Sequence, residues 1–287
     1  MKKSVFINPF VDRGFKILFG QESSKELLIE LINDLLEGEH HVEDLSYMDK
    51  EDPSETTDGR GTVFDLLCKD QDGTTFIVEL QNARQTYFYE RALYYLCRTI
   101  VSQGKKGESW EFELVPVYGI FLLNFRSGKT DKVRTDLVIA DRETGEQKSR
   151  NFREIFIEFP LFNKTEAECK TPLDYWLYNL KHMEQLEHLS FKGQKALFAR
   201  LEELARIANM NKKERAEYEA ALKIYRDNEN VVTTARREGI QIGEKRGLEK
   251  GRAEGILITA RLMKQNGISF EQIKLCTGLS DEEIENL

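Results

Sequence analysis

The sequence predicts an α/β sandwich with a helical C-terminal half. Apolar residues recur at helical spacing in residues 25–36, a β-rich hairpin pattern follows in residues 62–81, and the spacing is helical from about residue 165 to the end. The order of helix, hairpin, helix, strand and further strands is typical of helices packed on a sheet.

The first predicted element is a helix over residues 8–38. Its most regular part is KELLIELINDLL, for which Ser23 or Ser24 offers an N-cap, and Gly38 marks the end. Residues 39–61 are polar and predict a strand followed by a loop.

The next elements alternate between strand and helix. Residues 62–68 and 74–81 are β-rich and are separated by KDQDG, a strong hairpin signal. Residues 83–103 return to helical spacing. The run VPVYGIFLLNF is nearly continuous in apolar residues, as expected for a strand buried on both faces. Two more strands are predicted at 133–140 and 152–159.

The C-terminal half is predicted to be helical. One helix opens at Pro172, and two more span residues 191–209 and 212–227. We therefore expect three parts: a sheet-containing domain at 1–163, a helical region at 164–230 and a helical tail at 231–287.

Glycine recurs at every fourth position in REGIQIGEKRGLEKGRAEGI. The residues are Gly239, Gly243, Gly247, Gly251 and Gly255. Each glycine destabilises a helix by roughly 1 kcal/mol relative to alanine. The repeat fits two structures: a helix whose glycine stripe admits a second helix, or a flexible and weakly helical linker.

The last segment has the rhythm of a helix-turn-helix. Turns are predicted at Asn266-Gly267 and Gly278, and Ser280 with Glu283 forms a capping box for the final helix. That helix, SDEEIENL, is acidic and poorly suited to the major groove of DNA. A packing or oligomerisation module is therefore favoured over a DNA reader.

The composition is that of an ordinary soluble protein. The 287 residues are 32% charged and 40% hydrophobic, with a formal net charge of −8. No run approaches the roughly 18 apolar residues of a membrane span, and the first residues lack a secretory hydrophobic region, so we expect a cytoplasmic protein without membrane association. The negative charge argues against non-specific coating of nucleic acid. It does not exclude a nuclease, because the distribution of charge matters more than its sum.

Metal chemistry, if present, has to rest on carboxylates. The four cysteines contain no CxxC pair, and the four histidines show no HExxH spacing.

The hairpin predicts a pair of opposed carboxylates. If residues 71–73 form a three-residue loop with Gly73 left-handed, Asp65 lies opposite Glu79 on one sheet face, with side-chain bases about 5 Å apart. Gln81 projects from the same face. Two facing carboxylates repel each other unless a cation lies between them, and a hard divalent ion bound by oxygens removes that repulsion.

Such a pair suits phosphodiester hydrolysis, in which a metal ion stabilises the phosphoryl transition state and lowers the pKa of the attacking water. Asp65 and Glu79 would hold the ion together with the backbone carbonyl of Leu80. Gln81 stands where many such enzymes have a lysine, and a glutamine orients water but carries no positive charge. The spacing alone also occurs by chance on half-exposed hairpins that have no site.

Four segments in succession add a family resemblance to this pattern. They are DRGFKILFG, VFDLLCKDQDGTTFIVELQNARQTYFYERALYYLCRTIVSQG, PVYGIFLLNF, and the glycine-periodic tail with its GLSDEEI ending. Together they resemble the Rpn-type family of recombination-promoting nucleases and transposases, within the PD-(D/E)XK nuclease superfamily. The resemblance covers nearly the whole chain. It implies a PD-(D/E)XK restriction-endonuclease-like core, with a mixed central sheet flanked by helices, and magnesium-dependent DNA cleavage.

The resemblance also implies roles for individual residues. Asp65 and Glu79 match the metal ligands, and Gln81 matches the lysine position. Asp12 and Lys16 match first-helix positions of the family, where packing or capping roles are equally open.

Further candidates flank this set. Glu30 is a rival for an N-terminal carboxylate, and Gln85 and Arg91 are expected to face the same cleft from the helix after the hairpin. Arg91 would contact phosphate or, in the simpler alternative, form a structural ion pair.

Aromatic residues at helical spacing are usually buried. We therefore expect core positions rather than base-stacking platforms for four of them: Tyr94, Tyr95, Trp110 and Trp176.

The expected function is that of a DNA endonuclease that uses Mg²⁺, with Mn²⁺ as a substitute, and that is linked to recombination or mobile elements. DNA is the expected partner, and the C-terminal helices are candidates for homo-oligomerisation. The alternative is a catalytically weak DNA-binding or oligomeric scaffold protein that keeps the nuclease fold. Gln81 and the acidic net charge keep this alternative open.

Overall fold

The computed structural model describes residues 4–49, 51–52, 62–104 and 111–287. The chain divides into two compact units, Met1–Leu222 and Lys223–Leu287. The division of the first unit near residue 163 stays a prediction.

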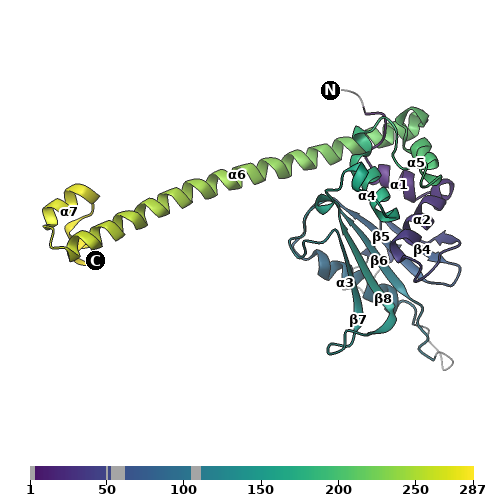
Figure 1. Cartoon of the computed structure of the whole chain (residues 1–287), viewed down its shortest axis with the longest axis horizontal. Helices are drawn as coiled ribbons and strands as arrows, with labels where there is room; N and C mark the ends of the chain where they lie inside the picture. Colours follow the sequence, from purple (N-terminus) through teal and green to yellow (C-terminus); the bar gives the residue numbers. More distant parts are fainter. Residues whose placement is uncertain (1–3, 50, 53–61, 105–110) are drawn as a thin grey trace. The chain divides into compact units, whose positions relative to one another are not determined.

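A mixed six-stranded sheet forms the centre of the first unit (Figure 1). Its strands, in spatial order, are β1 (Leu45–Tyr47), β4 (Leu66–Asp70), β5 (Thr75–Gln81), β6 (Val117–Leu123), β8 (Gln147–Glu158) and β7 (Arg134–Ala140). The pairs β5–β6 and β6–β8 are parallel, and the other pairs are antiparallel. Two short strands, β2 (Glu51–Asp52) and β3 (Thr62–Val63), pair separately. The predicted mixed sheet is confirmed.

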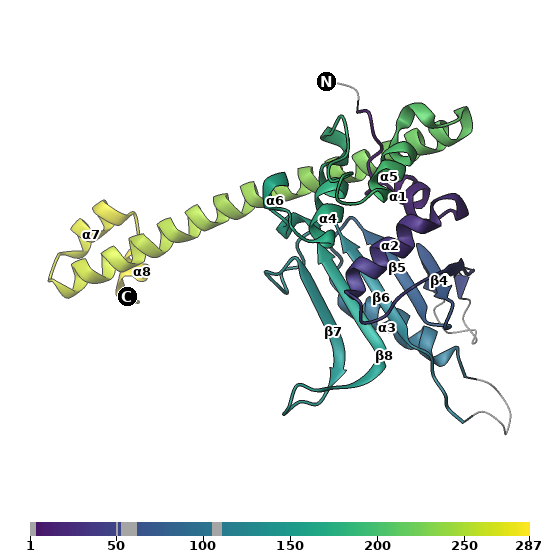
Figure 2. The same cartoon turned by 45° about the vertical axis from the view of Figure 1, so that its right-hand side comes forward.

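Helices cover both faces of this sheet, as Figure 2 shows. The α-helices that lie wholly within the first unit are α1 (Asp12–Phe19), α2 (Lys25–Leu36), α3 (Phe88–Val101), α4 (Pro172–His182) and α5 (Leu197–Ala205). Short 3-10 helices connect them: η1 (Glu22–Ser24), η2 (Phe159–Leu161), η3 (Glu166–Glu168), η4 (Met183–Gln185) and η5 (Ile207–Asn209). Helix α3 packs on the face that carries Ile77, Phe121 and Phe156, and the end of α2 contacts the opposite face. The flanking helices confirm the predicted fold class.

The prediction of one helix over residues 8–38 is wrong. The segment contains two helices, because α1 ends at Gly20 and η1 leads into α2. A Cβ at residue 20 would lie 2.9 Å from a methyl carbon of Leu66, so glycine lets the chain turn against β4. The apolar period continues across the turn, which is why the sequence alone suggests one helix.

Strand β6 is buried along its whole length, as predicted for a strand covered on both faces. Gly119 lies in its middle. A Cβ there would lie 2.6 Å from side-chain carbons of both Leu96 and Phe121. The absence of a side chain therefore lets α3 pack closely on the sheet.

Strand β8 begins earlier than predicted, at Gln147 instead of residue 152. The reason is a tight turn between β7 and β8, in which Asp141 donates its backbone N–H to the carbonyl of Glu146 at 2.8 Å. Gly145 supports this turn with a φ of 73°.

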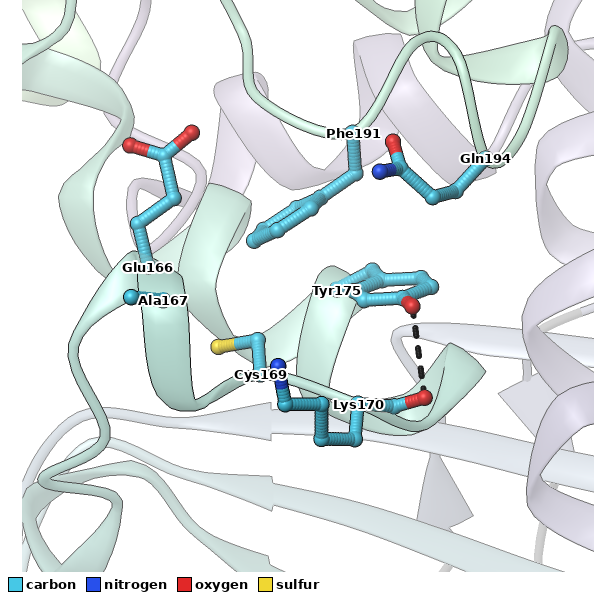
Figure 3. Close-up of a pocket in the computed structure, with 7 residues that line it drawn as sticks. All are labelled: Glu166, Ala167, Cys169, Lys170, Tyr175, Phe191 and Gln194. Atoms are coloured by element: carbon cyan, nitrogen blue, oxygen red, sulfur yellow. Dashed lines mark hydrogen bonds between the residues drawn. The ribbon is translucent and has the colours of Figure 1, made fainter.

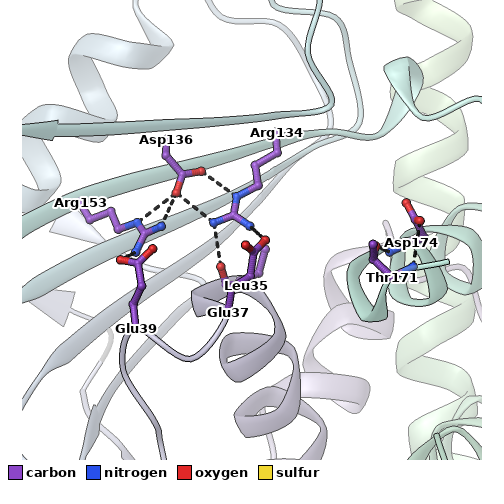
Figure 4. A network of polar contacts seen from close by, with 8 residues as sticks. All are labelled: Leu35, Glu37, Glu39, Arg134, Asp136, Arg153, Thr171 and Asp174. Atoms are coloured by element: carbon purple, nitrogen blue, oxygen red, sulfur yellow. Dashed lines mark hydrogen bonds and ion pairs between the residues drawn. The ribbon is translucent and has the colours of Figure 1, made fainter. Parts of the chain in front are cut away.

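The face opposite α3 carries a network of charged side chains (Figure 4). The Asp136 carboxylate accepts hydrogen bonds from Arg134 on its own strand and from Arg153 on β8. Arg134 also pairs with Glu37, and Arg153 with Glu39, both in the segment after α2. The network links the segment after α2 to β7, the edge strand, and to its neighbour β8.

The helices after residue 164 pack against the N-terminal helices. The carboxylate of Asp34 in α2 accepts hydrogen bonds from Trp176 Nε1 and Lys195 Nζ, each at 2.7 Å. The predicted helix at 191–209 is wrong in length, because α5 spans only Leu197–Ala205. Phe191 has a φ of 66°, which no helix interior accepts, so the chain before α5 turns instead.

The second unit is helical. Helix α6 (Lys212–Gln265) begins in the first unit and continues without interruption through the glycine repeat. It is followed by α7 (Phe270–Thr277) and α8 (Asp281–Glu285), and the predicted capping box of Ser280 and Glu283 is confirmed. A small core holds these helices together through Ala260, Ile273 and Ile284. In the described ranges, none of the helices combines the length and apolar character that crossing a bilayer requires.

Candidate active site on the β4–β5 hairpin

The hairpin has the predicted register. Leu66 pairs with Val78 and Lys69 with Thr75, so Asp65, the residue just before β4, stands opposite Glu79. The loop closes with Gly73 in the left-handed region, at a φ of 85°. Loop length and glycine conformation together fix the pairing of the strands.

The carboxylates of Asp65 and Glu79 lie together at the end of the hairpin. The backbone N–H of Asp65 donates to Glu79 Oε1 at 2.9 Å. The backbone N–H of Leu80 donates to Asp65 Oδ2 at 2.8 Å. Each acidic side chain is thus held by a backbone group of the opposite strand. Asp65 is half-buried and Glu79 is 6% exposed.

Burial and mutual repulsion dominate the electrostatics of this pair. Burial and the neighbouring charge of Asp65 raise the pKa of Glu79 to about 8, against the opposing charges of Arg91 and Lys16. Two close carboxylates in a partly dry site bind a proton or a cation in preference to remaining both ionised. The predicted pair therefore has the geometry and the electrostatics expected of a cation site.

Gln81 and Arg91 stand beside the carboxylates. Arg91 Nη2 donates to Gln81 Oε1, and Nη1 donates to Gln85 Oε1 at 2.5 Å. The guanidinium also lies over the ring of Phe88, with 5.4 Å to its centroid. A cation from α3 thus contacts the side chain of Gln81.

The N-terminal candidates separate into two groups. Asp12 and Lys16 form an ion pair of 2.6 Å along α1, and the charge of Lys16 acts on Glu79. Glu30 instead pairs with Lys195, among the helices that pack on α2. The structure therefore brings Lys16 near the carboxylates and places Glu30 in a different contact.

A groove that the sequence did not predict opens beside Arg91. We call it the α3 groove; its volume is about 720 Å³ and it is lined by Gln85, Thr86, Tyr87, Glu90, Arg91, Tyr94 and Tyr95. The expected core position is wrong for Tyr94, which is 41% exposed, and confirmed for Trp176, which is fully buried. Tyr95 is half-buried, and Trp110 lies outside the described residues. The sequence did contain a signal for this groove: the spacing of Tyr87, Arg91 and Tyr94 places the three side chains on one face of a helix.

Two other features lie apart from the carboxylate pair. At the tip of the hairpin, ligand atoms of His40, Asp70 and Asp72 lie within 4.8 Å of one another. Asp70 Oδ1 already accepts the backbone N–H groups of Asp72 and Thr74, so this cluster serves the turn. The sequence contained only the D-x-D of KDQDG as a signal.

A second hollow of about 540 Å³ lies among the helices after residue 164 (Figure 3). The rings of Tyr175 and Phe191 stack there at 4.4 Å, and the Tyr175 hydroxyl donates to the backbone carbonyl of Lys170 at 3.2 Å.

Comparison with known proteins supports the fold and the broad function. The family model described as PD-(D/E)XK nuclease family transposase matches residues 9–235, which include the whole sheet and both hairpin carboxylates. No curated protein and no solved structure matches the chain. Because the family model covers most of the sequence, the chain belongs to the PD-(D/E)XK nuclease family of transposases.

Proposed function

We propose that the protein is a metal-dependent DNA endonuclease that hydrolyses phosphodiester bonds in recombination or in the movement of mobile elements. Membership of the family supports a nuclease or transposase. The observation that carries the finer proposal is the hydrogen-bonded opposition of Asp65 and Glu79 on one sheet face.

The donor set fits a hard divalent cation. Asp65 and Glu79 supply carboxylate oxygens and Leu80 supplies a backbone carbonyl, and oxygen donors of this kind are the ones Mg²⁺ prefers. We propose Mg²⁺ as the cofactor and Mn²⁺ as a substitute. When bound, such an ion stabilises the charge on the phosphoryl group and favours ionisation of water.

The other side chains of the site orient the reactants. The Gln81 amide is proposed to orient the attacking water, since it can donate and accept hydrogen bonds but cannot carry charge. Arg91, which holds Gln81, supplies a positive charge to phosphate. The charge that a lysine would supply at residue 81 thus comes from α3 instead.

Plasmid cleavage tests this function. Supercoiled plasmid is incubated with the wild-type protein in Mg²⁺ or in EDTA, beside Asp65→Asn and Glu79→Gln. We expect nicking that requires the metal and falls at least about 100-fold in both variants, because each removes a charged ligand. Asp72→Asn is the matched control, since it neutralises an exposed carboxylate at the other end of the hairpin. Cleavage that survives in both ligand variants would overturn the proposal.

Gln81 favours a second candidate, a DNA-binding scaffold with weak turnover. In that case the wild-type protein retards plasmid in a gel without cutting it. Gln81→Lys then decides whether the missing lysine is the cause. If the wild type does not cut and Gln81→Lys does so with metal, the result supports the scaffold. If the wild type itself cuts plasmid and Gln81→Lys cuts at the same rate, the scaffold is excluded.

The second unit is proposed to mediate homo-oligomerisation. Apolar side chains are exposed along α6 and α7, including Leu248 at 76% and Leu275 at 87%. Light scattering of the full chain and of a chain that ends at residue 230 measures the effect. A larger mass for the full chain is expected, and equal monomeric masses would contradict the proposal.

A further inference from the structure

Helix α3 has two faces with different environments. The residues packed on the sheet are fully or almost fully buried: Phe88, Ala92 and Leu96. The neighbouring face carries Tyr87, Arg91 and Tyr94, and the two tyrosines are 72% and 41% exposed. Aromatic rings exposed on a helix that already buries another face are typical of a binding surface.

The walls of the α3 groove suit a nucleobase. Tyrosine rings stack on bases of any sequence, and a guanidinium plane does the same or binds phosphate. Arg91 supplies that guanidinium. Glu90 adds a carboxylate that accepts hydrogen bonds and cannot donate them when ionised, which matches the amino and imino groups on the pairing edge of a base.

The groove adjoins the candidate active site. Arg91 lines the groove and donates to Gln81, which lies two residues beyond Glu79 on β5. Gln85 also lines the groove and accepts from the same guanidinium. A nucleotide bound here would therefore belong to the same strand, or the same junction, as a phosphodiester bound at the proposed metal site beside Asp65 and Glu79.

A paired base cannot use this surface. In a duplex, the ring faces are covered by neighbouring bases and the pairing edge is occupied by the complementary strand. We propose that the α3 groove binds an unpaired nucleotide, so that the substrate is DNA with a single-stranded, mismatched or flipped base. This proposal rests on the proposed nuclease function, because it names the DNA structure that the same site receives.

Equilibrium binding tests the proposal without using cleavage. Fluorescence anisotropy in EDTA compares a labelled duplex that contains one unpaired thymine with the same duplex fully paired. We expect the wild-type protein to prefer the unpaired duplex by about tenfold, which lies within the range measured for one base stacked on an aromatic side chain. In the double variant Tyr87→Ala, Tyr94→Ala the preference falls to about onefold, while affinity for the paired duplex is unchanged.

Controls separate stacking from folding and from catalysis. Tyr87→Phe with Tyr94→Phe keeps the rings and should keep the preference, and Val101→Ala removes an exposed apolar side chain of the same helix outside the groove. A 2-aminopurine at the unpaired position should be quenched by wild type and not by the double alanine variant. Equal affinity of wild type for both duplexes, or a preference that survives in the double alanine variant, overturns the groove proposal. Neither result bears on metal-dependent cleavage by Asp65 and Glu79.

Discussion

Arg91 donates a hydrogen bond to the amide oxygen of Gln81, so this side chain of β5 is held by a cation from α3. The same guanidinium donates to Gln85 and packs over Phe88 and Tyr95. These contacts fix the orientation of a glutamine that would otherwise rotate freely.

Arg91→Ala should lower the rate of plasmid cleavage by about 10- to 100-fold, the range typical of residues that orient groups at a metal site. Arg91→Lys keeps the charge but loses the fork of donors, so an intermediate rate is expected. Binding of Mn²⁺, measured by calorimetry, should be nearly the same in both variants. Wild-type cleavage in Arg91→Ala would show that Gln81 acts without this contact.

Metal binding should depend steeply on pH because of Glu79. Its pKa is raised to about 8, so in the metal-free protein the carboxyl is protonated below that pH and must lose a proton to bind an ion. The affinity for Mn²⁺ should rise up to about tenfold per pH unit between pH 6 and 8 and then level off. In Glu79→Gln the affinity should be weak and this rise should be absent. A flat wild-type profile over the same range would show that this carboxyl is already ionised or takes no part.

Glu154 should make folding stability fall as pH rises. It is 4% exposed, its Oε1 has no hydrogen-bond partner among the residues that the structure describes, and burial raises its pKa to about 7. Between pH 4.5, the pKa in the unfolded state, and about pH 7, the pKa in the folded state, the folded protein keeps this proton and the unfolded chain loses it. The stabilisation is therefore fully present below pH 4.5 and is lost as the pH rises to about 7. The free energy of unfolding of Glu154→Gln should rise by about 2 to 3 kcal/mol relative to that of the wild type as the pH goes from 5 to 8. Urea unfolding of both proteins at the two pH values measures this, and a constant difference would contradict it.

The contact of Asp34 with Trp176 and Lys195 should contribute strongly to the stability of the first unit. Asp34→Ala leaves a buried indole N–H without its acceptor and removes one of the carboxylates that pair with Lys195. We expect a loss of about 2 to 3 kcal/mol in the free energy of unfolding. Asp44→Ala, which removes an exposed ion pair with Lys25, is the control and should leave the free energy of unfolding nearly unchanged. Similar effects of the two variants would show that the Asp34 contact is unimportant.

Alanine substitution can test whether a second helix packs against the glycine repeat of α6. Apart from its own stretch of helix, a Cβ at any of these five glycines would meet no atom of the described residues within 4 Å. If the stripe has no partner helix, alanine at all five positions should raise helix stability by roughly 0.5 to 1 kcal/mol each and increase helical circular dichroism. A loss of stability, or a smaller mass in light scattering, would indicate that a second helix packs against the stripe.

The sequence predicted the register of the hairpin correctly because local chemistry determines it. The loop KDQDG fixes the register through Gly73, and the register alone brings Asp65 opposite Glu79. No long-range contact is needed to set this register. The same holds for the capping box of Ser280, which depends on residues three apart.

Features that depend on tertiary contacts were missed. Gly20 ends α1 because the chain turns against Leu66, which the sequence places far away. Tyr94 follows the same helical spacing as buried aromatics, and only the position of α3 on the sheet decides which face stays exposed. At the glycine repeat, the sequence left a helix and a weakly helical linker as alternatives, and in the structure α6 continues through it.

Gly119 gives the fold an evolutionary constraint. A Cβ at this position in β6 would collide with Leu96 and Phe121. The close distance between α3 and the sheet therefore depends on the lack of a side chain at residue 119. A lineage that acquired alanine here would have to trim one of those two neighbours at the same time. Otherwise α3 would move outward and carry Arg91 away from Gln81. Residues 96, 119 and 121 are therefore expected to change only together among relatives that keep this packing.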